Sequence, residues 1–496
     1  MPPRSPSTLA TEAIIAMAAK YSEGLPGYVE ASTIPRQIAA TISASLLNSS
    51  VAVLLTGSTG HLGSDILEIL LKDARVERIF TLDREGKGAA PRARQRARWA
   101  DKGLDEQLLE LPKLVVLCGD LSAPKFVLDK EVYDEMRAKV SVIIHAAWSV
   151  NLIRPLAAFE PSVRGLRALV DFARPASKGV RILFTSTFYS ARSWSGTAED
   201  SAPAASALPD FDSAPPDFDP APPDSDSAPP DFDPTSPVSA PLASGALSRT
   251  PAPKILGRTP VPNTLGRTPV PESLIDDPAS CIGGGGYGQS KYVAERILAA
   301  SGVEFASVRI GQVCGGRTGA EICIKETRRG AWATTNWLPI LVKTSLALGA
   351  LPTDEQPMPW LPMDVTTHAL LDIVFSPKPL EPSYNLVHPR PISFSKIIGF
   401  VQRSLASTTG PGIKLIPFLH DVCAGGTFGR DFAMEKMMRI SSANMMGISS
   451  ANMMGTSSAL RDLDHICQAD VDAWVRYWEE CGMFSGRGMD VMRARM

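Results

Sequence analysis

The chain has 496 residues, of which 44% are hydrophobic and 21% charged, and its formal net charge at pH 7 is −2. This is the composition of a soluble globular protein with room for about two or three domains, and it gives no reason to expect a nucleic acid or an anionic membrane as partner. Seven cysteines without a CxxC pair or metal-ligand spacing favour reduced thiols, a cytoplasmic location and no metal site. No apolar run reaches the roughly 20 residues that a membrane-spanning helix needs.

Residues 1–50 are predicted to be a lead-in, or linker, with one short amphipathic helix over 10–21. From residue 51 short apolar runs alternate with amphipathic segments, which predicts an α/β fold with a Rossmann-type, doubly wound parallel sheet. The first part of this α/β domain is expected over 51–194. Its strands are predicted at 51–55, 76–82, 114–118, 140–145 and 180–185, and its clearest helices at 64–72 and 159–173.

A glycine-rich turn, TGSTGHLG, follows the first predicted strand. The first glycine permits a tight turn, the second lets backbone approach a pyrophosphate, and the third lets the helix pack closely. Because the helix N-terminus then faces the phosphates, the turn is predicted to bind a dinucleotide. Its residues are Thr56, Gly57, Ser58, Thr59, Gly60, His61, Leu62 and Gly63.

The second predicted strand ends in Asp83, and Arg84 follows it. An acid at this place bonds the ribose hydroxyls of NAD, whereas an arginine accommodates the 2′-phosphate of NADP, so the two residues conflict. A basic run at positions 92, 94, 96 and 98 either helps to hold a phosphate or is a solvated helix face. We favour NADPH over NADH, with Asp120 and Leu121 placed near the adenine and Ala146 where the cofactor passes close to backbone.

Residues 195–280 interrupt the pattern. SAPPDFDP starts at Ser213 and again at Ser227, and LGRTPVP starts at Leu256 and again at Leu265. Such proline-rich, acidic sequence cannot bury enough apolar surface to fold, so it predicts a disordered insertion. A docking tail for a basic partner and translated intron-like repeats are the alternatives. Another repeat, ISSANMMG at Ile440 and Ile448, predicts a loop.

Two of the predicted catalytic residues follow the insertion, in a second part of the nucleotide domain over 281–335. Tyr287 and Lys291 lie four residues apart, on one face of a helix that Gly283 to Gly286 would join flexibly to the insertion. Lys291 is expected to lower the pKa of Tyr287 and to bind the nicotinamide ribose, so that Tyr287 donates a proton to an oxygen that gains charge. Thr187, with Ser186 as the alternative, offers that oxygen a second hydroxyl.

Taken together, the segments resemble the thioester reductase domains that end fungal adenylate-forming and nonribosomal-peptide-synthetase-like reductases. These domains belong to the extended short-chain dehydrogenases, as do the male-sterility-type acyl-CoA reductases. The matching segments are Leu54–Gly63, Gly119–Ser122, His145–Asn151, Gly286–Leu298, Arg309–Gly315 and Gly330–Pro352.

The resemblance implies a smaller substrate-binding C-terminal part, over 336–496, and Thr187, Tyr287 and Lys291 as the catalytic set. It implies that NADPH reduces a carrier-bound acyl thioester to an aldehyde, or onward to an alcohol, in secondary metabolism. The sequence has no GGxS carrier motif before residue 51, so a phosphopantetheinyl carrier protein or another acyl-thioester donor would act in trans.

Other functions on the same scaffold stay open. An aldehyde or ketone reductase, or a sugar-nucleotide epimerase, needs the same tyrosine and lysine, and a dinucleotide sensor or inactive remnant needs neither. The apolar stretch from Trp332 to Pro352 suits an acyl or aryl group better than a sugar nucleotide. Trp148, Trp332, Trp337 and Trp360 either line such a pocket or pack in the core.

Overall fold

The computed structural model describes residues 5–27, 50–86, 88–174, 179–196, 269–317, 330–409, 413–417 and 448–484. Most of the predicted insertion at 195–280 lies outside these residues. So does the first copy of the ISSANMMG repeat.

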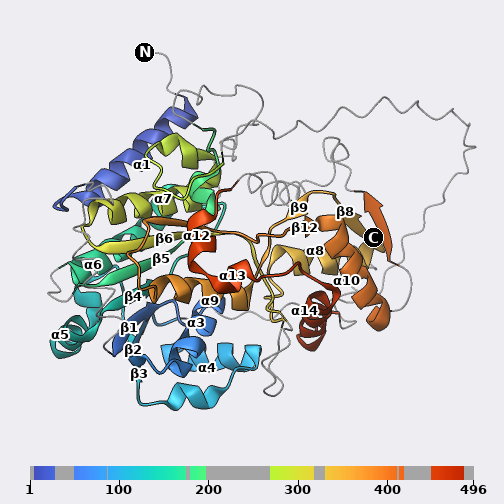
Figure 1. Ribbon diagram of the computed structural model, residues 1–496, viewed down its shortest axis with the longest axis horizontal. Helices are drawn as coiled ribbons and strands as arrows, with labels where there is room; N and C mark the ends of the chain where they lie inside the picture. The colour runs from blue at the N-terminus through green and yellow to red at the C-terminus, as the bar shows by residue number, and fades with distance from the viewer. Residues whose placement is uncertain are drawn as a thin grey trace, which may run out of the picture. The chain divides into compact units, whose positions relative to one another are not determined.

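The centre of the fold is a seven-stranded sheet in which every neighbouring pair of strands is parallel. Its order, β11-β6-β5-β4-β1-β2-β3, reverses between β1 and β4, the switch point at which open α/β sheets bind ligands. The predicted Rossmann-type fold is therefore confirmed (Figure 1). In sheet order the strands are Ser383–Leu386 (β11), Glu304–Ile310 (β6), Arg181–Thr187 (β5), Val142–His145 (β4), Val51–Thr56 (β1), Val76–Asp83 (β2) and Leu114–Cys118 (β3).

Helices cover both faces of the sheet. Successive side chains of a strand point to opposite faces, so Leu54 of β1 lies in one core and Val53 and Leu55 lie in the other. The first core receives side chains from Pro6–Ser22 (α1), Lys130–Lys139 (α5), Glu160–Ala173 (α6) and Gly285–Ala300 (α7). The second core receives them from His61–Lys72 (α3), Pro91–Lys102 (α4), Met363–Val374 (α9), Ala451–Thr456 (α12) and Ser458–Arg461 (α13).

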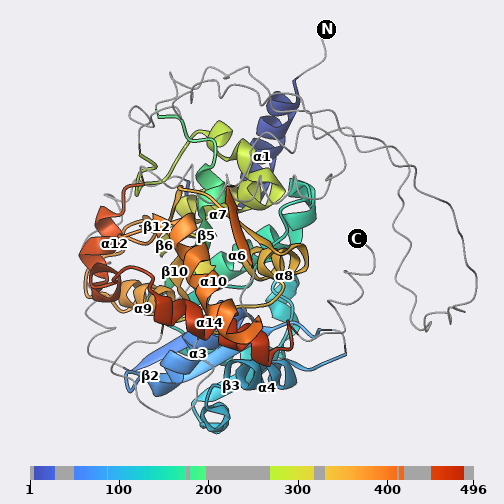
Figure 2. The same ribbon diagram turned by 90° about the vertical axis from the view of Figure 1, so that its right-hand side faces the viewer.

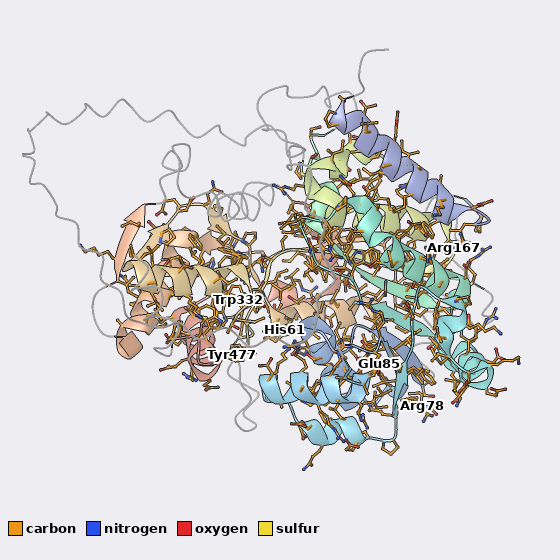
Figure 3. All side chains as sticks on the ribbon, turned by 180° about the vertical axis from the view of Figure 1, so that it is seen from behind. His61, Arg78, Glu85, Arg167, Trp332 and Tyr477 are labelled. Carbon is orange, nitrogen blue, oxygen red and sulfur yellow. The ribbon has the colours of Figure 1, made fainter. Side chains whose placement is uncertain are left out.

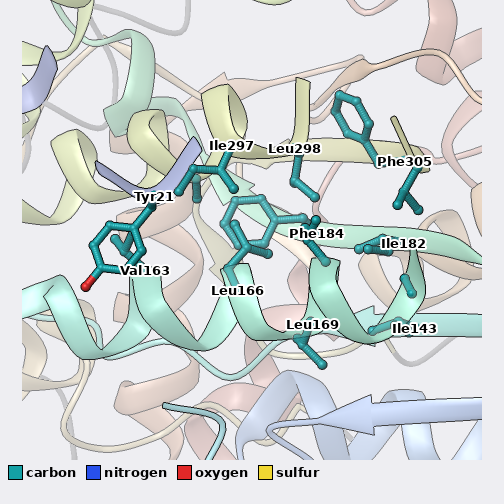
Figure 4. Close-up of a cluster of buried hydrophobic side chains, with 14 of the residues drawn as sticks. Tyr21, Ile143, Val163, Leu166, Leu169, Ile182, Phe184, Ile297, Leu298 and Phe305 are labelled. Atoms are coloured by element: carbon teal, nitrogen blue, oxygen red, sulfur yellow. The ribbon is translucent and has the colours of Figure 1, made fainter. Parts of the chain in front are cut away.

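Part of the first core is drawn in Figure 4, where leucines of α6 lie with aromatic and aliphatic side chains of β5 and α7. The helix predicted at 10–21 is confirmed as α1, which begins after the N-cap Ser5. It buries Ile14 and Tyr21 and lies along α7 in both views (Figures 1 and 2). The segment called a lead-in thus contributes to the core of the nucleotide-binding domain.

The sheet extends beyond residue 336, where the sequence suggested a boundary. β11 is an edge strand of only four residues, and α9, α12 and α13 pack on the second core. α12 and α13 begin in or just after the second ISSANMMG repeat, so the loop predicted there is wrong for 451–456. Met453 has no exposed surface, and this burial stabilises a helix that the repeat pattern did not indicate.

The remaining C-terminal elements enclose a third core of their own. Its helices are Trp337–Leu348 (α8), Phe394–Thr409 (α10) and Gln468–Glu480 (α14). Short strands join these elements in pairs: Val313–Cys314 (β7) with Leu361–Pro362 (β10), Pro357–Met358 (β9) with Ile392–Ser393 (β12), and Ala350–Thr353 (β8) with Lys414–Pro417 (β13). Among the described residues, no helix combines the length and the apolar character needed to cross a bilayer.

One turn beside the sheet is strained. Lys125, Phe126 and Val127 follow one another in the left-handed region, with φ of 48°, 60° and 59°. This conformation costs an L-residue about 1–2 kcal/mol. Packing of Val127 offsets little of that free energy because the residue is 69% exposed.

We therefore expect Val127→Gly to raise the free energy of unfolding by about 1 kcal/mol, after allowance for the extra freedom of glycine in the unfolded chain. Urea unfolding of the variant and of the parent chain measures the difference. Val127→Ala keeps a Cβ in the same conformation and should gain less. Equal stability of the glycine and alanine variants would show that the turn is not strained.

Candidate active site

The glycine turn lies between β1 and α3, at the carboxyl edge of the sheet. Gly57 has φ of +82°, and a Cβ there would lie 2.8 Å from the backbone of Ala146 and Ala147 at the end of β4. A Cβ on Gly63 would overlap the carbonyl oxygen of Gly57. The glycine turn therefore lies directly against the backbone after β4, and the helix packs on the turn itself because Gly63 has no side chain.

Asp83, the acid considered for the ribose, is instead bonded to the turn. Its carboxylate accepts a hydrogen bond of 2.5 Å from the Ser58 hydroxyl, and the nearby backbone N–H groups of Gly57 and Thr59 also favour its ionised form. Gln95 of α4 donates to the same serine oxygen at 2.7 Å. Burial raises the pKa of Asp83, and these hydrogen bonds act in the opposite direction. With its oxygens committed to the turn, Asp83 is poorly placed to bind a ribose.

The four arginines of the basic run divide into two pairs: Arg92 and Arg96 contact Glu110, and Arg94 and Arg98 contact the glycine turn. Arg92 and Arg96 form ion pairs with Glu110 at 3.3 and 2.7 Å, so the interpretation as a solvated helix face fits both. Arg94 faces the glycine turn, where it donates to the Thr59 hydroxyl at 2.9 Å and to the carbonyl oxygen of Arg84 at 2.7 Å. Arg84 is exposed just after β2. Two guanidinium groups thus lie beside the end of β2.

Arg98 connects the turn to the C-terminal helix α14. It donates to His61 Nε2 at 3.1 Å and to Asp101 at 2.8 Å, and Asp101 accepts from the Tyr477 hydroxyl at 2.9 Å (Figure 3). Burial and the Arg98 charge lower the pKa of His61 to about 4, so its imidazole is neutral and accepts through Nε2. No local pattern indicates this chain of contacts, because Asp101 and Tyr477 are 376 positions apart.

The other residues predicted to contact the cofactor lie around the same edge. Asp120 accepts from the backbone and side chain of Ser122 at 2.9 and 2.8 Å, which shapes the turn after β3. Leu121 contacts Gly165 of α6, and Leu62 packs on the second core. Thr56 turns its hydroxyl inward to His145 Nδ1, at 2.7 Å.

Thr187 and Tyr287 are brought together across the edge of the sheet. Thr187 ends β5, Tyr287 lies in the first turn of α7, and the Thr187 side chain lies close enough to act on the pKa of Tyr287. Ser186 points elsewhere and donates to Glu295 at 2.6 Å. Of the two hydroxyls that the sequence left open, the structure places that of Thr187 with Tyr287.

Lys291 is 2% exposed and donates to the carbonyl oxygen of Thr185 at 2.5 Å. Its ammonium lies 4.4 Å from the ring centroid of Trp148 and 5.9 Å from that of Tyr287. Burial lowers the pKa of Lys291 and raises that of Tyr287, against the hydrogen bond from Thr187. The expected lowering of the tyrosine pKa is therefore not found, and Tyr287 is a protonated donor at neutral pH.

The glycines before Tyr287 are contact positions rather than a flexible joint. A Cβ on Gly284 or on Gly288 would overlap the carbonyl oxygen of Tyr189, and one on Gly286 would overlap the backbone of Arg154 and Pro155. The first turn of α7 therefore rests directly on neighbouring backbone, which fixes the direction in which Tyr287 points.

Of the four tryptophans proposed for an acyl pocket, three belong to the third core. Trp332, Trp337 and Trp360 pack edge to face with centroids about 5.5 Å apart and are at most 7% exposed. Core packing accounts for them. Trp148 alone lies beside the catalytic helix, where its indole N–H donates to Ser290 at 3.2 Å.

Burial of His145 predicts a loss of stability in acid. Burial and the Lys291 charge lower its pKa to about 3, whereas an unfolded histidine titrates near 6.5. Below pH 6.5 the unfolded chain binds a proton that the folded chain does not. The free energy of unfolding therefore decreases as the pH is lowered, by up to about 1.4 kcal/mol per pH unit for this residue. Urea unfolding at several pH values between 7.5 and 5 gives the free energy of unfolding as a function of pH. We expect its slope against pH to be smaller for His145→Asn than for the parent chain. Equal slopes would contradict the assignment.

Comparison with known proteins agrees with this geometry. A family described as male sterility protein, whose model is of the NAD-binding type, matches residues 55–370. The adenylate-forming reductase Nps11 of Serpula lacrymans is 30% identical and covers 94% of this chain, and the carboxylic acid reductase of Neurospora crassa is 27% identical and covers 71%. This chain spans only 37% and 26% of those two relatives.

Solved structures share the fold at low sequence identity. The terminal R domain from the myxalamid PKS-NRPS biosynthetic pathway has a TM-score of 0.63 at 17% identity, over 96% of this chain and 99% of that one. A thiolation-reductase di-domain from an archaeal non-ribosomal peptide synthetase has a TM-score of 0.56 at 17% identity, over 90% and 97%. The family match covers well over half of the sequence, including the glycine turn, Thr187, Tyr287 and Lys291. The chain thus belongs to the male sterility protein family of NAD-binding domains.

Proposed function

We propose that this protein uses NADPH to reduce an acyl thioester to an aldehyde, or onward to an alcohol. The observation that carries the proposal is the placement of Thr187 and Tyr287, two hydroxyls at the carboxyl edge of the sheet, beside buried Lys291. Relatives named as adenylate-forming and carboxylic acid reductases support the reaction class.

The residues of the glycine turn fit a dinucleotide. A side chain at Gly57 or Gly63 would collide with neighbouring backbone, so the turn is as tight as a dinucleotide-binding turn requires. The N-terminus of α3 follows this turn and would face a bound pyrophosphate. Because Asp83 is committed to the turn and Arg84 and Arg94 lie beside the end of β2, we assign the 2′-phosphate of NADPH to the two arginines. Exchange of NADPH for NADH tests this preference.

In the proposed reaction, the bound dihydronicotinamide supplies a hydride to the thioester carbonyl carbon. Tyr287, whose raised pKa keeps its hydroxyl protonated, donates a hydrogen bond to the carbonyl oxygen as that oxygen gains charge. Thr187 donates a second one, and two donors fixed before the reaction stabilise the developing oxyanion. The C–S bond then breaks, the sulfur leaves as a thiol after it takes a proton, and the aldehyde forms. Lys291 is assigned to the nicotinamide ribose.

The thioester is proposed to arrive on a phosphopantetheinyl carrier protein in trans, with residues 336–496 supplying much of the acyl site. The thiolation-reductase di-domain among the solved structures of the same fold supports this partner. Fungal secondary metabolism is the proposed setting. Free cysteines at 118, 281, 314, 467 and 481 support a reducing, cytoplasmic compartment.

The decisive experiment measures oxidation of NADPH and NADH by the purified full chain, with acyl-pantetheine thioesters and, separately, with the matching aldehydes. Thioester-dependent oxidation with aldehyde or alcohol as product supports the proposal. Turnover of aldehydes alone would replace it with a carbonyl reductase. Binding of NADPH without any turnover would replace it with a dinucleotide sensor or an inactive remnant.

A further inference from the structure

We propose that Glu295 is a positioning residue, which holds Thr187 against Tyr287 through the two serines that flank Thr187. The inference rests on the proposed function and assigns a role to a buried carboxylate outside the predicted catalytic set. Glu295 lies on α7, eight residues after Tyr287, and is 1% exposed. The catalytic helix thus carries both the reacting hydroxyl and the group that fixes its neighbour.

One oxygen of Glu295 meets hydroxyls from both sides of Thr187. Its Oε1 accepts from Ser186 at 2.6 Å and lies 3.0 Å from the Ser190 hydroxyl. Ser190 has one proton and a second acceptor, the carbonyl oxygen of Thr187 at 2.7 Å. Ser186 therefore makes the stronger hydrogen bond to Glu295. The Ser190 hydroxyl instead bonds the short helix Phe188–Ala191 to the backbone of Thr187.

The charge of Glu295 is balanced within the protein. Arg309 of β6 pairs with Glu295 at 2.7 Å, and the Arg309 and Glu295 side chains are 1% and 2% exposed. Burial by itself would raise the pKa of Glu295, but Arg309 and the serine hydroxyls lower it, so the group is an ionised carboxylate. An ionised carboxylate only accepts hydrogen bonds, which fixes the serines as donors.

Backbone contact reinforces this connection. The carbonyl oxygen of Tyr189 lies where a Cβ of Gly284 or Gly288 would be, so segment 186–190 rests on α7 without intervening side chains. Loss of the Glu295 links would let the segment move away from the helix. A displacement of Thr187 would affect the transition state, where the oxyanion needs both donors, more than it affects binding of NADPH.

The same strands carry a comparable ion pair at their other end, which supplies a control. Arg181 begins β5 and Glu304 begins β6, and their side chains pair at 3.0 Å with 0% and 3% exposed. Arg181 also donates to the carbonyl oxygens of Val374 and Ser376, at the end of α9. This pair has the burial and charge of Glu295–Arg309 but lies at the opposite edge of the sheet from Thr187.

The test compares steady-state kinetics and NADPH affinity of Ser186→Ala, Ser186→Thr and Ser301→Ala in the full chain. Ser301 is the matched control, because it is 1% exposed, lies at the end of the same helix and donates to the carbonyl oxygen of Leu298 at 2.6 Å. We expect Ser186→Ala to lower kcat about tenfold with KM and the NADPH dissociation constant unchanged, the signature of a lost transition-state interaction. Ser186→Thr should restore most of kcat, and Ser301→Ala should retain it.

The route through Thr187 is tested by a double variant. In a Thr187→Val background, Ser186→Ala should cause no further loss of kcat, since its effect passes through the hydroxyl already removed. Additive losses would overturn the inference, as would equal kcat for Ser186→Ala and Ser301→Ala. Glu295→Gln and Glu304→Gln extend the comparison, with thermal unfolding as the check that each folds. A parent chain that turns over no thioester would instead refute the proposed function.

Discussion

Tyr287→Phe should lower kcat by about 10²- to 10⁴-fold, the range for loss of a general acid, and leave the dissociation constant of NADPH nearly unchanged. The substitution removes one oxygen and keeps a ring that packs between Phe159 and Tyr189, with centroids 6.2 and 6.0 Å away. Single-turnover oxidation of NADPH with an acyl-pantetheine thioester measures the chemical step, and fluorescence titration measures the affinity.

Tyr292→Phe is the matched control for that experiment. Tyr292 lies on the same helix, is 3% exposed, and donates to the carbonyl oxygen of Asp276 at 2.7 Å, on the side that faces the first core. Its loss should cost about 1 kcal/mol of stability and leave kcat unchanged. If Tyr287→Phe retained the kcat of the parent chain, the assignment of the proton donor would be wrong.

Gly63→Ala should weaken NADPH binding by about tenfold or more and lower the free energy of unfolding by about 1–3 kcal/mol. In most helices alanine is more favourable than glycine by up to about 1 kcal/mol, so the sign of the effect is diagnostic. Here the new Cβ would overlap the carbonyl of Gly57 and lie 3.0 Å from the Cα of Ser58. The turn must therefore shift, and with it the Ser58–Asp83 hydrogen bond.

Gly399→Ala on α10 provides the comparison for Gly63→Ala. The Cβ at Gly399 would meet only the guanidinium of Arg403, at 3.7 Å, so this variant should be as stable as the parent chain or more stable. Urea unfolding and NADPH titration of both variants give the result. Unchanged cofactor affinity in Gly63→Ala would show that the turn does not bind the dinucleotide.

Features that depend on neighbours along the chain could be predicted from the sequence alone. The spacing of apolar residues placed five strands of the parallel sheet, and the glycine spacing over 57–63 placed the strand-to-helix turn. Residues four apart on a helix share a face, so Tyr287 and Lys291 were identifiable as a pair before their surroundings were known. Two strands of the same sheet, β6 and the edge strand β11, were not predicted from this spacing.

Which side chains meet depends instead on how distant elements pack in the folded protein. Asp83 is committed to the turn because Ser58 lies opposite it, and Arg94 and Arg98 face the turn because α4 presents them there. The backbone of Tyr189 explains Gly284 and Gly288, on either side of Tyr287. The choice of Thr187 over Ser186 likewise depends on a carboxylate more than a hundred positions away, on α7. Partners of this kind come from packing between elements distant in the chain, and no periodicity in the sequence records them.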